Sequence, residues 1–200
     1  MTSNRLPPGL RKPGSVGSAA GPQVALLLES GEISTAPGLL GEVVISGPNV
    51  TLGYENNPKA NAESFISRDD VPYPWFRTGD QGTLDADGFL TITGRLKEII
   101  NRGGEKVSPK EVDEAVMDPP AVAQVVTFAM PHAKLGEEVA CAVVLKEGEA
   151  LDERGLKDFL APKLADFKLP KKVVFLAEIP KGATGKLQRI GLAAKLGLGG

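Results

Sequence analysis

The chain has 200 residues, of which 42% are hydrophobic and 24% charged, and its formal net charge is −2 at pH 7. This composition predicts one or two small folded domains and argues against a disordered chain. Without a long basic run, the chain is not expected to bind nucleic acid. The one cysteine, Cys141, excludes an intramolecular disulfide and is expected in the core, and the one histidine, His132, cannot form a zinc site alone and is expected in a loop.

The sequence gives no sign of a membrane span or of an export signal. No apolar run approaches the roughly 20 residues that a membrane-spanning helix needs, and the residues after Met1 do not form a secretory signal. The C-terminal residues, LGLGG, differ from the Ser-Lys-Leu signal of peroxisomal proteins. These features predict a cytoplasmic protein.

The first part of the chain is expected to form short strands and one helix. Residues 1–40 are rich in proline and glycine and contain one apolar run, Val24–Leu28, which needs neighbouring strands to pair with. A second strand is predicted over Gly41–Ser46. Asn57 is a plausible N-cap, and Pro58 is then the first residue of a short helix.

The segment after residue 75 predicts a β-hairpin. Two short apolar runs, Thr83–Asp85 and Phe89–Thr93, are joined by an Asp-Gly turn, which is a strong hairpin signal. The acidic residues of the DADG turn could suggest a calcium loop, but the ligands that such a loop needs on both sides are absent. We therefore expect a turn here and no metal site.

A different unit is predicted after residue 95. The sequence LKEII, residues 96–100, is strand-like, and residues 101–107 form a glycine-containing loop. Ser108, Pro109 and Glu111 follow in the order of a capping box, with serine at the N-cap, proline at the first helical position and glutamate at the third. A helix is expected from there to the prolines at 119 and 120.

The remaining residues alternate between strands and one further helix. Strands are predicted over Val122–Ala129, Glu138–Leu145 and Val173–Leu176, and Asp152 is expected to cap a helix with apolar residues spaced by three and four positions. Strands alternating with two helices predict a compact α+β unit of about 100 residues.

Four polar motifs carry side chains suited to a nucleotide or an acyl group. Asp80, in TGD, is an acceptor for two neighbouring hydroxyls, and Arg95 offers a rigid fork of donors for ribose or phosphate oxygens. Gly103 and Gly104 allow a sharp hairpin turn or a close approach to a ligand. Lys186 directly follows Gly185 in a glycine-containing segment, and its side chain can reach a carboxylate or a phosphate. Taken singly, each motif is more typical of an ordinary turn or a solvated charge.

The motifs occur in the order WFRTGD, GRLKE, INRGGEKVSP and PKGATGKLQR. In this order the chain resembles the C-terminal portion of the adenylate-forming superfamily of acyl-CoA synthetases, luciferases and peptide-synthetase adenylation domains. Within it the chain is similar to the acid–CoA ligases, and to oxalate–CoA ligases in particular through RKPGSVG and INRGGEKVSP. The resemblance implies that Asp80 holds the ribose hydroxyls of ATP, that Arg95 contacts the nucleotide and that Lys97 is a hinge residue.

The same resemblance assigns the later motifs to the two chemical steps. Gly103, Gly104 and Lys106 are implied to line the tunnel for the pantetheine of CoA, and Lys186 is implied to act in adenylation. The family's phosphate loop and its aromatic-Thr-Glu segment, which bind ATP and Mg²⁺, do not occur in this sequence. The ligands of Mg²⁺ and most residues that bind the acid are therefore expected outside it.

The resemblance implies an α+β fold with two parts. Residues 1–94 correspond to the C-terminal part of the large AMP-binding domain, with short strands and hairpins, and residues 95–200 to the small, mobile C-terminal domain. The implied function is that of an ATP-dependent acid–CoA ligase with a small carboxylic acid, ATP and CoA as substrates. Three alternatives stay open: a non-catalytic binding module, a ligase for an aromatic or medium-chain acid, and a relative of peptide synthetases or luciferases.

The two parts are expected to differ in stability. Strands within residues 1–93 are predicted to lack some of their sheet partners, which would leave open edges and apolar faces that favour association. Residues 97–200 are expected to fold alone, because their strands and helices can enclose a core of their own.

Overall fold

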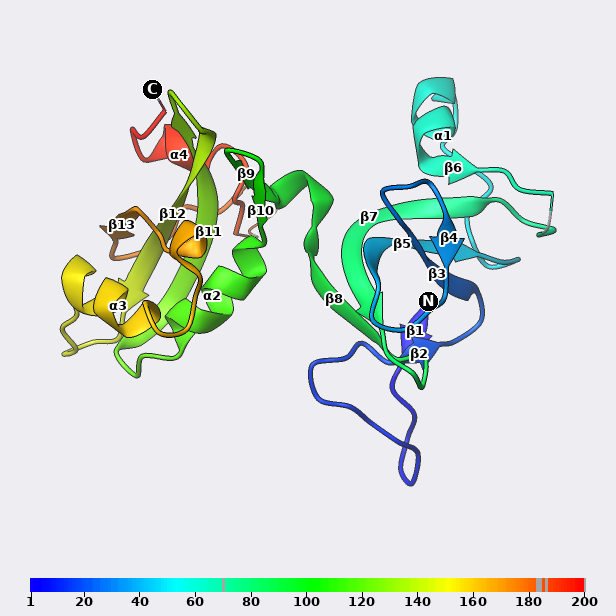
Figure 1. Cartoon of the computed structure of the whole chain (residues 1–200), viewed down its shortest axis with the longest axis horizontal. Coiled ribbons are helices and arrows are strands. Elements are labelled where there is room, and N and C mark those ends of the chain that lie inside the picture. The colour runs from blue at the N-terminus through cyan, green and yellow to red at the C-terminus, as the bar shows by residue number, and fades with distance from the viewer. Residues whose placement is uncertain (70, 183–184, 186, 200) are drawn as a thin grey trace. The chain divides into compact units, whose positions relative to one another are not determined.

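In the computed structural model, which describes residues 1–69, 71–182, 185 and 187–199, the chain divides into two compact units. Unit 1 is Met1–Leu96 and unit 2 is Lys97–Gly200. The division lies at Leu96/Lys97, whereas the sequence placed a boundary between residues 94 and 95. Each unit has its own sheets and core, and the combination of sheets with few helices confirms the α+β class predicted from the sequence (Figure 1).

Unit 1 is built on a six-stranded sheet with the order β4-β3-β5-β7-β6, in which β8 pairs with β7, and on a separate two-stranded ribbon, β1-β2. Its elements are β1 (Thr2–Ser3), β2 (Ser18–Ala19), β3 (Gln23–Leu27), β4 (Ile33–Ser34), β5 (Leu40–Ser46), α1 (Pro58–Ser64), β6 (Phe65–Ile66), β7 (Trp75–Leu84) and β8 (Leu90–Arg95). Among the described pairings of this sheet, all are antiparallel.

Strand β7 is the centre of unit 1. It is longer than the strand predicted near residue 83, because it begins at Trp75, and it curves strongly in Figure 1. It pairs with β5, β6 and β8, and the predicted hairpin is confirmed as β7–β8. In the turn, Asp85 Oδ1 accepts hydrogen bonds from the backbone N–H groups of Asp87 and Phe89, each at 2.9 Å. The acidic residues therefore serve the turn, as expected.

Alternating side chains give the sheet of unit 1 an apolar cluster on each face. Val24, Leu26 and Val43 belong to one cluster, and Ala25 and Val44 to the other. This is the period of two that a strand imposes. The sheet therefore has buried apolar residues on both faces.

Two local features of unit 1 fix its connecting segments. Asn57 caps α1 as predicted, since its side chain accepts a hydrogen bond from Ala60 N–H at 3.1 Å. Lys12 forms ion pairs with Asp85 and, at 2.6 Å, with Asp87, which ties the N-terminal segment to the β7–β8 turn. The ion pair raises the pKa of Lys12.

Unit 2 contains a five-stranded sheet with the order β10-β9-β12-β11, in which β13 pairs with β12. Its elements follow η1 (Leu96–Glu98) and are β9 (Ile100–Arg102), β10 (Glu105–Val107), α2 (Pro109–Met117), β11 (Val122–His132), β12 (Gly136–Leu145), α3 (Glu153–Leu160), η2 (Asp166–Lys168), β13 (Lys172–Phe175) and α4 (Leu192–Lys195). Strands β11 and β12 are antiparallel, and β13 is parallel to β12.

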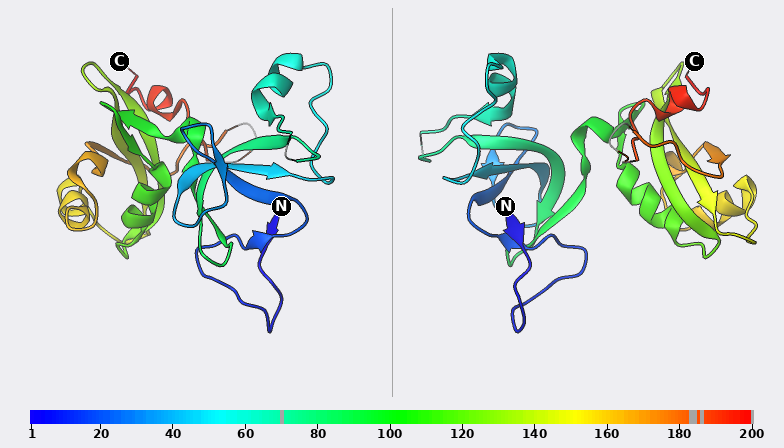
Figure 2. Two further views of the ribbon diagram at one scale, coloured as in Figure 1. Left: turned by 45° about the vertical axis from the view of Figure 1, so that its right-hand side comes forward. Right: turned by 180° about the vertical axis from the view of Figure 1, so that it is seen from behind.

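The two faces of the sheet in unit 2 are covered by different elements. Helices α2 and α3 pack on one face, around a cluster that includes Cys141 and Leu156. The C-terminal segment with α4, red in Figure 2, packs on the other face through Ile179 and Leu192 against Phe128. Cys141 is a core residue as predicted, and burial raises the pKa of its thiol to about 12.

Several predicted details of unit 2 differ in the structure. Residues 96–98 form a 3₁₀ helix, so the strand predicted over LKEII begins only at Ile100. The predicted loop at 101–107 is the tight β9–β10 hairpin. Ser108 is the N-cap of α2 as predicted, but its side chain forms no capping hydrogen bond, so the serine half of the predicted capping box is not made. His132 ends β11 instead of lying in a loop, and its Nδ1 accepts hydrogen bonds from the N–H groups of the next turn.

Candidate active site

The TGD motif lies in a bulge of β7. Strand β7 pairs with β5 through Arg77 and again through Gln81, so Thr78–Asp80 stand opposite Val43 alone. Extra residues on one strand bend it and redirect its side chains, and such bulges are frequent beside functional sites. The bulge therefore decides where the Asp80 carboxylate points.

Local hydrogen bonds hold the bulge in place. Thr78 Oγ1 donates to the carbonyl oxygen of Val43 at 2.7 Å and accepts from the N–H of Asp80 at 3.1 Å. The N–H of Gly79 donates to Glu42 Oε1 at 3.1 Å, and Gly79 has a φ of +73°, which side chains other than glycine rarely adopt. All three motif residues thus have a structural role in presenting the aspartate.

Glu42 supports the TGD motif, and its role was not predicted from the sequence. Its side chain is 7% exposed, and Glu42 Oε2 accepts hydrogen bonds from Arg77 Nε at 2.9 Å and Arg77 Nη2 at 2.7 Å. The signal was present, because a glutamate within the apolar strand GEVVIS must find a partner when it is buried. The partner is 35 positions away, which no local pattern could indicate.

The structure brings two of the predicted nucleotide-binding residues together. Asp80 on β7 and Arg95 on β8 are direct cross-strand neighbours. Arg95 Nε is 2.7 Å from Asp80 Oδ1, and their side chains are 60% and 19% exposed. A carboxylate has two oxygens and a guanidinium has five donors, so each group can contact a further ligand while the pair is formed. The two side chains form an accessible acceptor and donor pair.

The predicted hinge residue and the predicted CoA-binding residues lie in unit 2. Lys97 is in η1, at the division between the units. Gly103 and Gly104 form the β9–β10 turn with φ values of +59° and +100°, and Lys106 is on β10. The turn is held from the neighbouring hairpin, because the N–H of Gly103 donates to the carbonyl oxygen of Leu135 at 2.9 Å.

An ion pair fixes the glycine hairpin to the central strand of unit 2. Arg102 Nε is 2.6 Å from Glu138 Oε1, and the Glu138 side chain is 5% exposed. Burial acts to raise the pKa of Glu138, but the hydrogen bonds from Arg102 and from the N–H of Val139 outweigh it, so that the pKa is below its ordinary value. The hairpin is therefore attached to β12 by a charged side chain as well as by its backbone.

Lys186, the predicted catalytic lysine, lies outside the described residues. Residues near it in the sequence are described and belong to unit 2. Lys181 and Leu187 form an isolated antiparallel bridge, and the N–H of Gly185 donates to the carbonyl oxygen of Gly182 at 2.9 Å. The predicted residues therefore fall in two groups: Asp80 and Arg95 in unit 1, and the others in unit 2.

Comparison with known proteins agrees with the motif order. Residues 111–186 match the model of the AMP-binding enzyme C-terminal domain. The chain is 51% identical over 189 residues to oxalate–CoA ligase of Saccharomyces cerevisiae, covering 94% of this chain and 34% of that protein. Oxalate–CoA ligase of Arabidopsis thaliana is 50% identical over 190 residues, with 94% and 36% covered. Over nearly its whole length, the chain is thus similar to the C-terminal part of these CoA ligases.

Solved structures of the adenylate-forming superfamily have the same fold over this length. The crystal structure of ATP-bound MatB from Rhodopseudomonas palustris matches with a TM-score of 0.84 and 35% identity, covering 94% of this chain and 37% of that protein. The resemblance inferred from the motifs is thereby confirmed. The chain spans about a third of the length of the adenylate-forming relatives that it matches.

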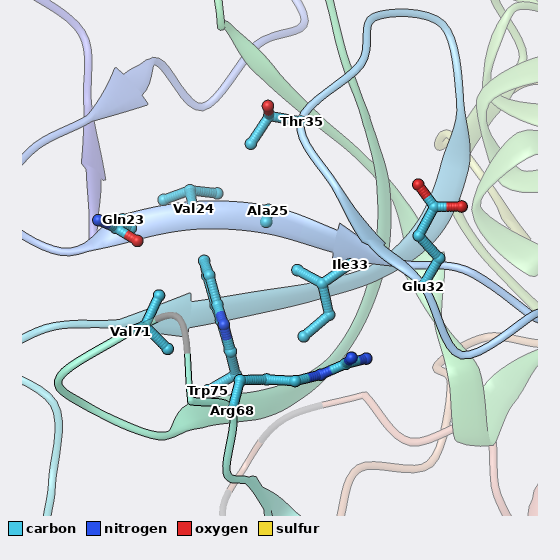
Figure 3. Close-up of a pocket in the computed structure, with 9 residues that line it drawn as sticks. All are labelled: Gln23, Val24, Ala25, Glu32, Ile33, Thr35, Arg68, Val71 and Trp75. Atoms are coloured by element: carbon cyan, nitrogen blue, oxygen red, sulfur yellow. The ribbon is translucent and has the colours of Figure 1, made fainter.

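Unit 1 also has a pocket of about 510 Å³, shown in Figure 3. It is lined by Trp75 and by side chains of β3, β4 and the segment before β7, namely Gln23, Val24, Ala25, Glu32, Ile33, Thr35, Arg68 and Val71. Asp80 and Arg95 are not among its lining residues, so it is separate from the acceptor and donor pair.

No three His, Cys, Asp or Glu side chains among residues 1–69, 71–182, 185 and 187–199 gather into a possible metal site. In the same part of the chain, no helix is long and apolar enough to cross a membrane.

Proposed function

We propose that this chain provides the C-terminal part of an ATP-dependent acid–CoA ligase. Residues 1–94 are the end of the large AMP-binding domain, and residues 95–200 are the mobile C-terminal domain. In the first step, a carboxylate oxygen of the acid attacks the α-phosphorus of ATP, giving an acyl-adenylate and pyrophosphate. In the second step, the thiol of CoA attacks the acyl carbon, and AMP leaves.

The observation that carries this proposal is the pair between Asp80, in the bulge of β7, and Arg95 on the neighbouring strand β8. Asp80 is the acceptor for the ribose hydroxyls, and Arg95 is a donor for the nucleotide. Two observations favour this assignment: Arg95 Nε is 2.7 Å from Asp80 Oδ1, and Glu42 holds the backbone beside Asp80. Side chains that are already in position lose little conformational freedom when the nucleotide binds. Two charged residues that are direct neighbours on adjacent strands also hold each other in place before ligand arrives.

The remaining roles lie in unit 2. Lys97 is the hinge, which is supported by the division of the chain between Leu96 and Lys97. Gly103, Gly104 and Lys106 contact the pantetheine of CoA, supported by the two glycines at a tight turn. Lys186 contacts the reacting carboxylate and phosphate, where a positive charge stabilises the charge that develops during attack.

We further propose that oxalate is the acid. The support is the identity of 51% and 50% to two oxalate–CoA ligases, compared with 39% to the sulfoacetate–CoA ligase of Cupriavidus necator. Mg²⁺ is a usual companion of ATP. The described residues gather no ligand set for it, so no step is assigned to it in this chain.

A fusion tests the proposed ligase function. The matching part of the yeast oxalate–CoA ligase is replaced by this chain, and pyrophosphate release with oxalate, ATP and CoA is measured. We expect an active fusion in which Asp80→Asn raises KM for ATP by roughly tenfold, the effect of about one lost charged hydrogen bond. The matched control is Asp87→Asn, a turn aspartate on the same hairpin with a 63% exposed side chain, which leaves KM unchanged.

Two results would contradict the proposal. A folded fusion that releases no pyrophosphate excludes the ligase function of the chain, and equal effects of the two aspartate variants exclude a nucleotide role for Asp80. The acid is tested by a second fusion to the corresponding part of the 2-succinylbenzoate–CoA ligase of Bacillus cereus, which is 39% identical to this chain over the matched region. Each fusion is assayed with the acid of the ligase that supplies the upstream part, because most acid-binding residues are expected there. A larger fraction of the parent ligase's activity in the second fusion than in the oxalate fusion contradicts the proposal for oxalate.

A further inference from the structure

Arg189 is the centre of a polar network in unit 2. Arg189 Nε is 2.9 Å from Glu98 Oε2, and its Nη2 is 2.7 Å from Asp113 Oδ2. Its Nη1 donates to the carbonyl oxygen of Thr127 at 3.0 Å. These partners belong to η1, α2 and β11, so one side chain connects the C-terminal segment with three other elements. A guanidinium can bind three acceptors in fixed directions, which a lysine ammonium does less well.

The network is largely shielded from solvent. The side chains of Arg189, Asp113 and Glu98 are 22%, 16% and 31% exposed. Asp113 Oδ1 also accepts a hydrogen bond from the N–H of Thr127 at 2.7 Å. Burial raises the pKa of Asp113 although Arg189 acts to lower it. Removal of Arg189 would leave a shielded carboxylate without its cation, which is more costly than breaking an exposed pair.

Two buried residues of the apolar cluster under α4 flank position 186 in the sequence. Ile179 precedes it and is fully buried, and Leu192 follows it with 1% exposure. Between these two anchors, Lys181 and Leu187 form an isolated antiparallel bridge. Apolar contacts hold both ends, but they are non-directional and do not set the orientation of the residues between them.

We propose that Arg189 is a positioning residue for Lys186, because it holds the stretch of residues 187–192, which follows that lysine in the sequence, against η1, α2 and β11 of the same unit. Arg189 is three residues from Lys186, and its contact with Glu98 connects this stretch to the segment of Lys97. The inference rests on the proposed function, because Lys186 has a catalytic role only in an adenylate-forming enzyme. The conformational part of the inference can be tested without catalysis.

The first test is digestion of the whole 200-residue chain with endoproteinase Lys-C, followed by mass spectrometry. We expect Arg189→Ala to accelerate cleavage after Lys186 by about tenfold, because the residues that follow Lys186 lose their attachment to η1, α2 and β11. Cleavage after Lys172, in β13, reports opening of the whole unit and should change much less. The matched control is Arg154→Ala, whose arginine is 90% exposed and 3.9 Å from Asp158, and which should digest like the unchanged chain.

The second test uses the fusion to the yeast ligase. Arg189→Ala should lower kcat for pyrophosphate release by roughly tenfold or more while KM for ATP stays within about twofold, since misplacement of a reacting group affects the transition state. Arg189→Lys should have a kcat between those of Arg189→Ala and the unchanged fusion, because lysine keeps the positive charge but cannot bind three acceptors in fixed directions.

Each outcome decides one proposal. Unchanged cleavage after Lys186 in Arg189→Ala, or equal acceleration after Lys172, overturns the inference, and so does an unchanged kcat. If the fusion with unchanged Arg189 is inactive, the proposed function fails. In that case the Lys-C digestion alone decides whether Arg189 holds the stretch.

Discussion

Glu42 shows how one buried carboxylate can control the backbone beside a binding residue. Its two oxygens serve Arg77 and the N–H of Gly79, so the loss of Arg77 leaves a shielded charge in the sheet. We predict that Arg77→Ala destabilises unit 1 by about 2–4 kcal/mol. Arg95→Ala breaks a pair whose arginine is 60% exposed and should cost less than about 1 kcal/mol.

Urea unfolding followed by tryptophan fluorescence measures both effects. Trp75 is the single tryptophan and is 6% exposed in unit 1, so its emission reports this unit alone. If Arg77→Ala and Arg95→Ala lower the free energy of unfolding equally, burial of Glu42 does not determine how much the Arg77 pair contributes to stability. Loss of cooperativity in Arg77→Ala would instead show that the bulge is needed for a single folded state.

Glu138 gives unit 2 a pH dependence with a definite sign. Its pKa is lower in the folded state than the ordinary value of 4.5, so the unfolded chain binds the proton more tightly. Its contribution to stability is therefore complete above about pH 4.5 and is lost as the pH falls through the folded-state pKa. In Glu138→Gln this contribution should be absent at every pH.

Amide hydrogen exchange of β12 between pH 3 and 7 checks this prediction, with intrinsic rates corrected for pH. The protection of the unchanged chain should fall more steeply with acid than that of Glu138→Gln, and the two should converge at the acid end. Glu137→Gln is the neighbouring control, because Glu137 also accepts a backbone hydrogen bond, from the N–H of Asn101, but is only half-buried. Parallel profiles for the unchanged chain and Glu138→Gln would contradict the predicted shift.

At the scale of elements, the bulge of β7 depends on backbone conformation and not on space. Gly79 has a φ of +73°, and a Cβ added there would meet no atom within 4 Å. Gly79→Ala should therefore destabilise unit 1 by about 1–2 kcal/mol through backbone strain alone. Gly79→Asn should cost less, because asparagine tolerates the left-handed region. The same fluorescence experiment measures both, and a larger loss for asparagine than for alanine would contradict a purely conformational cause.

At the scale of the whole molecule, the two units differ in how much apolar surface they leave exposed. Unit 1 exposes several large apolar side chains, among them Leu6 at 81% and Leu52 at 97%, whereas unit 2 covers both faces of its sheet with helices. We predict that residues 97–200 fold alone and that residues 1–93 are cut first in limited proteolysis with a low-specificity protease. Protection of 1–93 together with rapid cutting throughout 97–200 would refute this prediction.

The sequence by itself determined the features that depend on nearby residues. The caps at Asn57 and Asp152 and the β7–β8 turn follow from side chains that bond to the backbone two to four positions away. The alternating apolar runs located β5, β11 and β12 closely. The order of the four motifs gave a resemblance that agrees with the CoA ligases matched over 94% of this chain.

Only the tertiary structure decided which distant charges meet. Glu42 and Arg77 are 35 positions apart, and Glu98 and Arg189 are 91 apart, so no local pattern could pair them. The bulge of β7 also escaped prediction, because it is defined by residues on β5 that lie opposite. Local preferences select helices, strands and turns, but the positions of side chains from different elements depend on how those elements pack. The physical reason is that burial requires a charged group to find a partner wherever the fold brings one within reach.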